Sequence, residues 1–199
     1  MALQPTGELH TPRRARALGE SARDRVLGTA YGLFAGNGIR AVGVDTIVAE
    51  AEVAKMTLYR YFPSKEELVL AFLDLREQRW THEWLEAEIE RLGTTPRERV
   101  LAIFDVFDEW FRRSDYEGCS FIKTLLEVND RGSPIRGAAV GHLDAIRAML
   151  EAHAEQGGAP DPQATAYELQ ILMMGSIVSA SRGDLDAARR ARRVAEMLL

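Results

Sequence analysis

The stretch from residue 44 to residue 68, VDTIVAEAEVAKMTLYRYFPSKEEL, constrains the fold of this chain more than any other part of it. Its apolar residues have the spacing of two short helices separated by a three-residue turn at 51–53. A further helix is expected to begin at Ser64, because Glu67 follows at the spacing of a capping box. The residues expected to pack inward are Ile47, Val48, Ala51, Val53, Leu58 and Phe62. Two short helices joined by a tight turn predict a helix-turn-helix.

The rest of the chain carries helix signals and no alternating strand pattern. Thr95-Pro96, Ser133-Pro134 and Asp161-Pro162 each place a capping side chain before a proline at the first helical position. The helices expected outside the motif span about 26–34, 64–92, 96–113, 119–130, 134–156, 162–182 and 184–198. The sequence therefore predicts an all-α chain of about nine helices. A three-helix helix-turn-helix domain at 20–63 is followed by a larger helical bundle at 64–199.

Charge and composition narrow the classes of function. The 199 residues carry a net charge of −5, but residues 1–70 hold nine Arg or Lys against eight Asp or Glu. Because local phosphate neutralisation decides DNA affinity, this near-neutral part leaves nucleic acid open as a partner. The single Cys119 excludes a disulfide framework, and no spacing of His, Cys, Asp or Glu suggests a metal site. The longest apolar run, 171–180, is too short to cross a bilayer and no secretory signal is visible, so we expect a cytoplasmic protein.

Polar and aromatic side chains on the exposed faces of the motif are the candidate DNA contacts. They are Arg40, Thr46, Lys55, Met56, Thr57, Tyr59, Tyr61 and Lys65. Lysine can donate to guanine acceptors or phosphates, a threonine methyl can touch thymine, and tyrosine hydroxyls suit phosphate oxygens. Lys65 stands at a helix N-terminus, which itself attracts phosphate. The alternative is a solvated helix face without function, and Tyr59 could be half core.

The first 19 residues contain Arg13, Arg14 and Arg16 and show no apolar periodicity, so we expect a flexible basic arm. Such an arm could add contacts to the DNA backbone or the minor groove. A tail that only keeps the chain in solution is the equal alternative.

The motif stretch resembles the signature of TetR-type transcriptional regulators over about residues 22–70. The matching residues are Thr46, Ile47, Ala49, Val53, Leu58, Tyr59, Tyr61, Phe62, Ser64, Lys65, Glu66 and Leu68. The resemblance implies that the DNA-contacting positions of the family fall on Lys55, Thr57, Tyr59, Tyr61 and Lys65. It also implies a helical body with a ligand cavity, and a dimer formed by the last two helices.

Three departures from the signature lie in the turn region. The Val48-Ala49 pair comes one register earlier than usual, and Ala54 replaces a helix-capping serine. Glu52 stands where glycine is common. If position 52 needs a positive φ, a residue other than glycine costs about 1–2 kcal/mol there.

Aromatic and sulfur-containing side chains are frequent on the middle helices, where a ligand would bind. The candidate ligand-binding residues are Trp80, Trp84, Phe104, Phe107, Asp108, Phe111, Phe121 and Met149. Each aromatic residue could instead be ordinary core, and Asp108 could lie on a solvated face. Cys119 has no obvious local base and is expected to be a small buried residue rather than a nucleophile.

The helix expected at 162–182 is apolar on almost every side from Ile171 to Ala180, so two surfaces must cover it. We expect it to form a homodimer face within about 162–198, with two-fold symmetry. The partners on the final helix would be Ala187, Ala191, Val194, Ala195 and Leu198. Burial of both helices within one chain is the alternative.

These features predict a sequence-specific DNA-binding regulator, namely a homodimeric repressor released from a palindromic operator by a small molecule. An activator or a ligand-independent regulator of the same family is the first alternative. An all-α protein-interaction module with a structural helix-turn-helix is the alternative from another class. We expect no cofactor and no enzyme, since no Ser-His-Asp order, glycine-rich phosphate loop or pair of carboxylates stands out.

Overall fold

The computed structural model describes residues 21–199, which form helices and connecting turns without any strand. The helices are α1 (Ala22–Asn37), α2 (Val44–Glu50), α3 (Lys55–Tyr61), α4 (Lys65–Arg76), η1 (Glu77–Glu86), α5 (Ala87–Leu92), α6 (Pro96–Phe111), α7 (Ser120–Glu127), α8 (Pro134–Gln156), α9 (Pro162–Ser181) and α10 (Ala187–Leu198). Because α4, the π-helical η1 and α5 continue one another, the described residues form nine separate helices, and the predicted all-α fold is confirmed. The arm with Arg13, Arg14 and Arg16 lies outside the described residues.

The helix starts follow the capping signals with one exception. Thr95 and Glu98 form a complete capping box, and Asp161 accepts a hydrogen bond from the backbone of Ala164. Ser64 accepts from the backbone of Glu67. Ser133 precedes Pro134 as expected, but its side chain makes no capping hydrogen bond. Proline and its fixed φ are therefore sufficient to start α8.

The last helix begins three residues later than predicted, and α7 ends three residues earlier. Gly183 has φ +97°, and Asp184 lies in the turn that follows it. The side chain of Asp184 accepts a hydrogen bond from the backbone N–H of Asp186. At the other site, Asp130 accepts from the backbone of Gly132. In both places a short acidic side chain bonds its own neighbouring backbone, which competes with helix formation.

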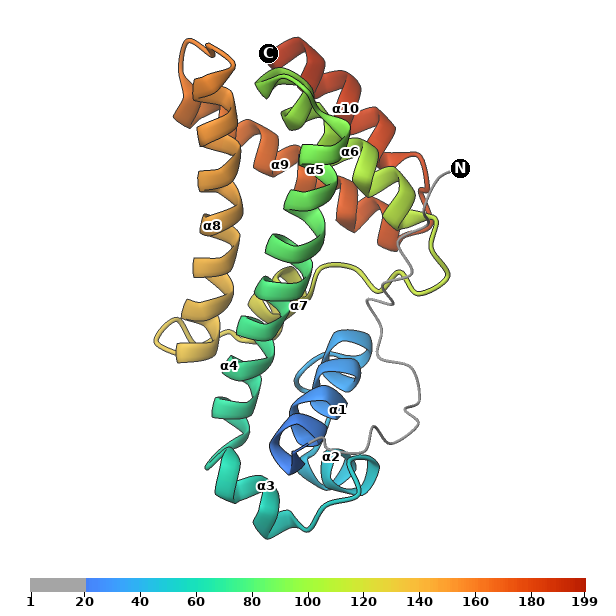
Figure 1. The fold of residues 1–199 in the computed structure, drawn as a ribbon, viewed down its shortest axis with the longest axis vertical. Helices are drawn as coiled ribbons and strands as arrows, with labels where there is room; N and C mark the ends of the chain where they lie inside the picture. Colours follow the sequence, from blue (N-terminus) through green and yellow to red (C-terminus); the bar gives the residue numbers. More distant parts are fainter. Residues whose placement is uncertain (1–20) are drawn as a thin grey trace.

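Helices α1, α2 and α3, which we call the reading head, lie at one end of the molecule, and α10 lies near the other (Figure 1). The continuous helix α4–η1–α5 runs from the reading head into the body. Phe34 of α1 packs on Phe72 of α4 at 5.5 Å between ring centroids, and Tyr31 packs on the same ring at 5.6 Å. The reading head is therefore docked on the body by an aromatic core.

Helix α9 contains the apolar run at 171–180 but is covered on one side only. Leu169, Met173 and Ile177 are buried, whereas Ile171 is 69% exposed. None of the helices formed by residues 21–199 combines the length and the apolar character needed to cross a bilayer. Among residues 21–199, nothing covers this exposed apolar side of α9.

Candidate nucleic-acid interface and body cavity

The turn between α2 and α3 contains the one residue other than glycine with a positive φ among residues 21–199. Glu52 has φ +52°, which is the left-handed region. The chain needs this conformation because Ala51 ends α2, while Val53 must already turn its side chain towards the core. Position 52 therefore does adopt a positive φ, and Glu52 has backbone strain there that glycine would not have.

Glu52→Gly should stabilise the fold relative to Glu52→Ala by about 1 kcal/mol. Both variants lack the carboxylate, so its interactions cancel in the comparison, and only the Cβ strain and the extra chain entropy of glycine differ. Urea denaturation of the two variants measures the difference. An alanine variant as stable as the glycine variant would contradict strain at this position.

Helix α3 begins without a side-chain cap, because its N-cap residue is Ala54. Leu58 is fully buried and fixes the rotation of the helix. Met56 then lies 84% exposed and Tyr59 41% exposed. Thr57 is half-buried. With this rotation, α3 presents to solvent a face that contains both polar and apolar side chains. A helix that enters a major groove needs such an exposed face.

Lys55 is tied to α2 by an ion pair. Its Nζ lies 2.7 Å from Oδ1 of Asp45, and this hydrogen bond raises the pKa of Lys55. Asp45 occupies the first turn of α2, where a carboxylate interacts favourably with the helix dipole. Both side chains are largely exposed, so the pair is weak and Lys55 can exchange it for a phosphate. Thr46, the next residue on α2, is also exposed.

The end of α3 and the start of α4 hold further candidate contacts. Arg60 stacks on the ring of Tyr61 at 4.8 Å and donates to its hydroxyl at 3.1 Å. Lys65 is half-buried, with Nζ 6.0 Å from the centre of the Phe34 ring. Burial lowers the pKa of Lys65, and the carboxylate of Glu127 acts in the opposite direction. The position of Lys65 is thus set jointly by the reading head and by α7.

Two side chains of α7, Lys123 and Glu127, hold the reading head, and we call them the α7 clasp. The ammonium of Lys123 donates to the carbonyl of Ala35 at 2.8 Å, in the last turn of α1. The carboxylate of Glu127 accepts from the backbone N–H of Arg40 at 2.8 Å. It also fills the space beside Gly38, whose φ is +85° and where any larger residue would clash with it.

The α7 clasp was missed by the sequence analysis. Its signal was a Lys-Thr-Leu-Leu-Glu run that places a cation and a carboxylate one helical turn apart at positions 123 and 127. Such a pair usually marks a solvated face, and nothing local says that it meets residues almost ninety positions away. The side chain of Arg40 is exposed beside it.

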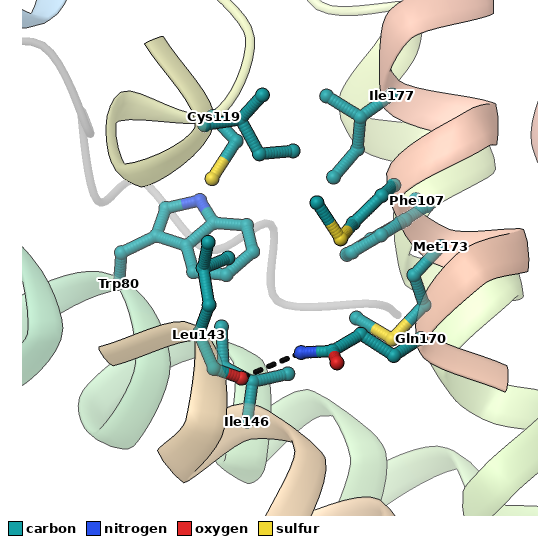
Figure 2. Close-up of a pocket in the computed structure, with 10 residues that line it drawn as sticks. Trp80, Phe107, Cys119, Leu143, Ile146, Gln170, Met173 and Ile177 are labelled. Carbon is teal, nitrogen blue, oxygen red and sulfur yellow. Dashed lines mark hydrogen bonds between the residues drawn. The ribbon is translucent and has the colours of Figure 1, made fainter. Parts of the chain in front are cut away.

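A small apolar cavity lies in the body between η1, α6, α7, α8 and α9 (Figure 2). The cavity has room for little more than one water molecule, whose centre can move within about 20 Å³. The total space not filled by atoms, including the part open to solvent, is about 290 Å³. Trp80 and Phe107 are the two predicted ligand-binding residues that line it. The lining also includes Cys119, Ile122, Leu143, Ile146, Gln170, Met173, Met174 and Ile177.

The other six predicted ligand-binding residues lie away from this cavity. Trp84 and Phe111 belong to the aromatic cluster behind it, and Phe121 stacks on His142 at 4.9 Å. Phe104 is core, and Met149 is half-buried on α8. The carboxylate of Asp108 pairs with Arg112 at 3.0 Å and Arg189 at 3.1 Å, so it ties α6 to α10. In the described part of the chain, no group of three or more His, Cys, Asp or Glu could hold a metal ion.

The prediction that alanines of the final helix contribute to a dimer face is wrong. Ala187, Ala191 and Ala195 are buried within the chain, where α10 packs against α6 and α9. Their small size permits this close approach of helices. The large apolar side chains that remain exposed on α9 and α10 are Tyr167, Ile171, Val178, Val194 and Met197.

Comparison with known proteins matches most of the chain to one family. Residues 26–72 match the bacterial regulatory proteins of the tetR family, and residues 96–195 match the tetracyclin repressor-like C-terminal domain. The transcriptional regulator QacR of Staphylococcus aureus is 37% identical over 34% of this chain, but that match spans only 36% of QacR. The transcriptional repressor NemR of Escherichia coli is 27% identical over 68% of both chains. The TetR-family regulator SCO4454 of Streptomyces coelicolor has a TM-score of 0.79 and 28% identity, over 89% of this chain and 87% of that one.

Proposed function

This chain belongs to the tetR family of bacterial regulatory proteins, which are DNA-binding transcriptional regulators, and from this premise we propose a homodimeric repressor that a small molecule releases from a palindromic operator. Residues 20–63 would read the DNA, and residues 64–199 would bind the effector and form the dimer. A regulatory family leaves no role for catalysis. The similarity to NemR, a transcriptional repressor of Escherichia coli, supports repression over activation.

The exposed face of α3 is the observation that carries DNA recognition. Met56 and Tyr59 stand out from a helix whose buried Leu58 holds it in place. Lys55 would exchange Asp45 for a phosphate or a guanine, and the Met56 and Thr57 side chains would meet base edges. Tyr59, Tyr61, Lys65, Arg40 and Thr46 would hold the flanking phosphates. Seven residues of helix supply only a few base contacts, so one reading head alone would be weakly specific.

A dimer through α9 supplies the second reading head. Tyr167, Ile171 and Val178 repeat at helical spacing on the exposed side of α9, with Gly175 exposed between them. A second copy of the same face would cover them, since two-fold symmetry brings each surface against itself. The exposed Val194 and Met197 of α10 would extend this contact. Two reading heads fixed at one spacing would then read a palindrome.

Helix α7 would connect the effector to the DNA. At its start, Cys119 and Ile122 line the cavity. Further along the helix, Lys123 and Glu127 hold Ala35 and Arg40 of the reading head. A molecule that widens the cavity would move α7 and shift both hydrogen bonds. Operator affinity would fall at most by the ratio of the effector's affinities for the protein with the widened cavity and for the DNA-binding form.

Selection of genomic DNA fragments bound by the purified protein tests the proposed function. We expect enrichment of a palindrome, confirmed by gel shifts whose affinity falls steeply with salt. Selection of no DNA, with no salt-sensitive binding to the fragments upstream of its own gene, would favour the protein-interaction module instead. Selected genes whose transcription falls on deletion of the protein would identify an activator.

Lys65→Ala should weaken operator binding about fivefold per reading head near physiological salt, and reduce the salt slope by about 0.9 per head. The effect should be similar on different operator sequences, since a phosphate contact carries no base information. Gel shifts over a salt series measure both quantities. Arg91→Ala, at an exposed site on α5, removes the same charge far from α3 and is the matched control. Equal salt slopes for the two variants would remove Lys65 from the interface.

A further inference from the structure

Resting on the proposed function, we infer that the effector is an uncharged, largely apolar small molecule with one hydrogen-bond acceptor, such as a carbonyl oxygen, that accepts from the indole N–H of Trp80. The inference names the chemical class of the effector and the residue that selects it. It follows from three properties of the cavity: its uncharged lining, an unpartnered buried donor, and walls that can yield.

The lining of the cavity is uncharged. Its side chains are aromatic, aliphatic or sulfur-containing, apart from the neutral amide of Gln170. An ion entering it would lose its hydration without meeting an opposite charge among the lining side chains, which disfavours its binding. Burial also raises the pKa of the Cys119 thiol, which keeps it protonated and a poor nucleophile. The cavity therefore selects neutral molecules held without a covalent bond.

One donor in the cavity wall has no partner. Trp80 is 2% exposed, and its Nε1 makes no hydrogen bond with any residue in the range 21–199. Figure 2 shows this nitrogen turned towards the Cys119 end of the cavity, away from the backbone of η1. A buried N–H without an acceptor has lost its hydrogen bond to water and gained none in return, which costs free energy. A ligand oxygen placed there would accept from this N–H and remove the cost, so a ligand with such an oxygen should bind more tightly than one without it.

The opposite end of the cavity is closed by a hydrogen bond that spans two helices. The amide nitrogen of Gln170 on α9 donates to the carbonyl of Leu143 on α8 at 2.6 Å (Figure 2). Because this bond engages the amide nitrogen of Gln170, the buried donor of the lining that stays without a partner is the N–H of Trp80, and one acceptor in the ligand pairs with it. The bond also limits how far α8 and α9 separate.

The cavity must widen to hold anything larger than a water molecule. Met173 and Met174 form part of its wall, and flexible thioether side chains repack more readily than branched ones. Ile122 belongs to the short helix α7, so widening in that direction displaces the α7 clasp. A compact molecule of about the size of a single substituted ring would fill the widened space.

The test compares acetophenone with α-methylstyrene, which has the same shape but carries CH₂ in place of the carbonyl oxygen. Ligand-observed NMR titration of the free full-length protein should show acetophenone binding about tenfold more tightly, the value of one hydrogen bond to a buried donor. Benzoate, which adds a charge to the same ring, should show no binding at equal concentration. Equal affinities for the first two probes, or preference for benzoate, would overturn the inference.

Trp80→Phe removes the N–H and keeps an aromatic ring, so it should bring the affinity ratio of the two probes from about ten to about one. Trp110→Phe makes the same change in the ring that packs on Trp80 at 5.1 Å but lies outside the lining, and should keep the ratio. Loss of the preference in both variants would mean that packing, not the N–H, selects the ketone. If Trp80→Phe fails to fold, the probe comparison on the native protein still decides.

These measurements use free protein, so they stand apart from the proposed function. Failure of all three probes to bind would overturn the effector class and leave operator binding intact. Binding of acetophenone with the expected dependence on Trp80, but without any weakening of the operator gel shift, would keep the site and reject its regulatory role. Acetophenone should weaken the gel shift of the native protein, and should have less effect on Trp80→Phe.

Discussion

Ile171→Arg should convert the proposed dimer into monomers and reduce operator affinity at least about a hundredfold. Ile171 is 69% exposed at the centre of the apolar side of α9. In a two-fold interface each arginine would lie near its symmetry mate, so two charges would be buried without a partner. In a dimer, binding of one reading head holds the second close to its half-site, which typically raises the overall affinity by about 10²–10⁴. A monomer loses this gain.

Sedimentation velocity measures the oligomeric state of this variant, and gel shifts on the selected operator measure its affinity. Leu126→Arg on α7 is the matched control, because Leu126 is 72% exposed and lies outside the proposed interface. The control should remain dimeric. A dimeric Ile171→Arg protein with unchanged operator affinity would place the dimer face elsewhere, and the exposed apolar side of α9 would then need another occupant.

Arg76→Met should destabilise the protein by about 3 kcal/mol, the usual cost of breaking a buried ion pair from one side. The side chain of Arg76 is 3% exposed, and its Nη1 lies 3.3 Å from Oε1 of Glu117, whose side chain is 13% exposed. The same nitrogen donates to the hydroxyl of Tyr31 at 3.0 Å, deep between the reading head and the body. Methionine fills the volume of the arginine but leaves the Glu117 carboxylate without this cation.

Chemical denaturation at one protein concentration measures the change, since the stability of the proposed dimer would depend on concentration. Arg79→Met is the matched control: Arg79 also stacks on Tyr31, at 5.4 Å, but is exposed and should cost less than about 1 kcal/mol. The double variant Arg76→Met/Glu117→Gln should recover part of the loss, because the buried charge is then removed. Equal losses at Arg76 and Arg79 would show that the buried pair contributes little.

Much of the fold followed from short-range signals. Thr95-Pro96 and Asp161-Pro162 marked the starts of α6 and α9, since capping and the fixed φ of proline act within one helical turn. The condition for strain at Glu52, a positive φ, could be stated from the sequence because the turn geometry of the motif depends on a few adjacent residues, and the structure meets it. The exposure of Met56 and Tyr59 followed from the inward position of Leu58 on the same short helix.

The body was predicted less well, because its side chains are sorted by neighbours distant in sequence. Eight residues were proposed for a ligand, and the cavity is lined by Trp80 and Phe107 alone among them. Aromatic composition could not separate these two from Phe104 or Trp84, which pack elsewhere with the same chemistry. The alanines of α10 had the spacing of a helix–helix contact, and they are buried within the chain against α6 and α9.

The sequence by itself determined the helices, the helix-turn-helix and the family, because all three depend on interactions between residues a few positions apart or on the order of residues in a short signature. The tertiary structure alone decided that Glu127 reaches Arg40, that the N–H of Trp80 stays unpartnered in a cavity wall, and that one side of α9 is left exposed. These facts depend on how long helices cross and which faces meet. Packing settles that jointly over the whole chain, so no short stretch of sequence contains it.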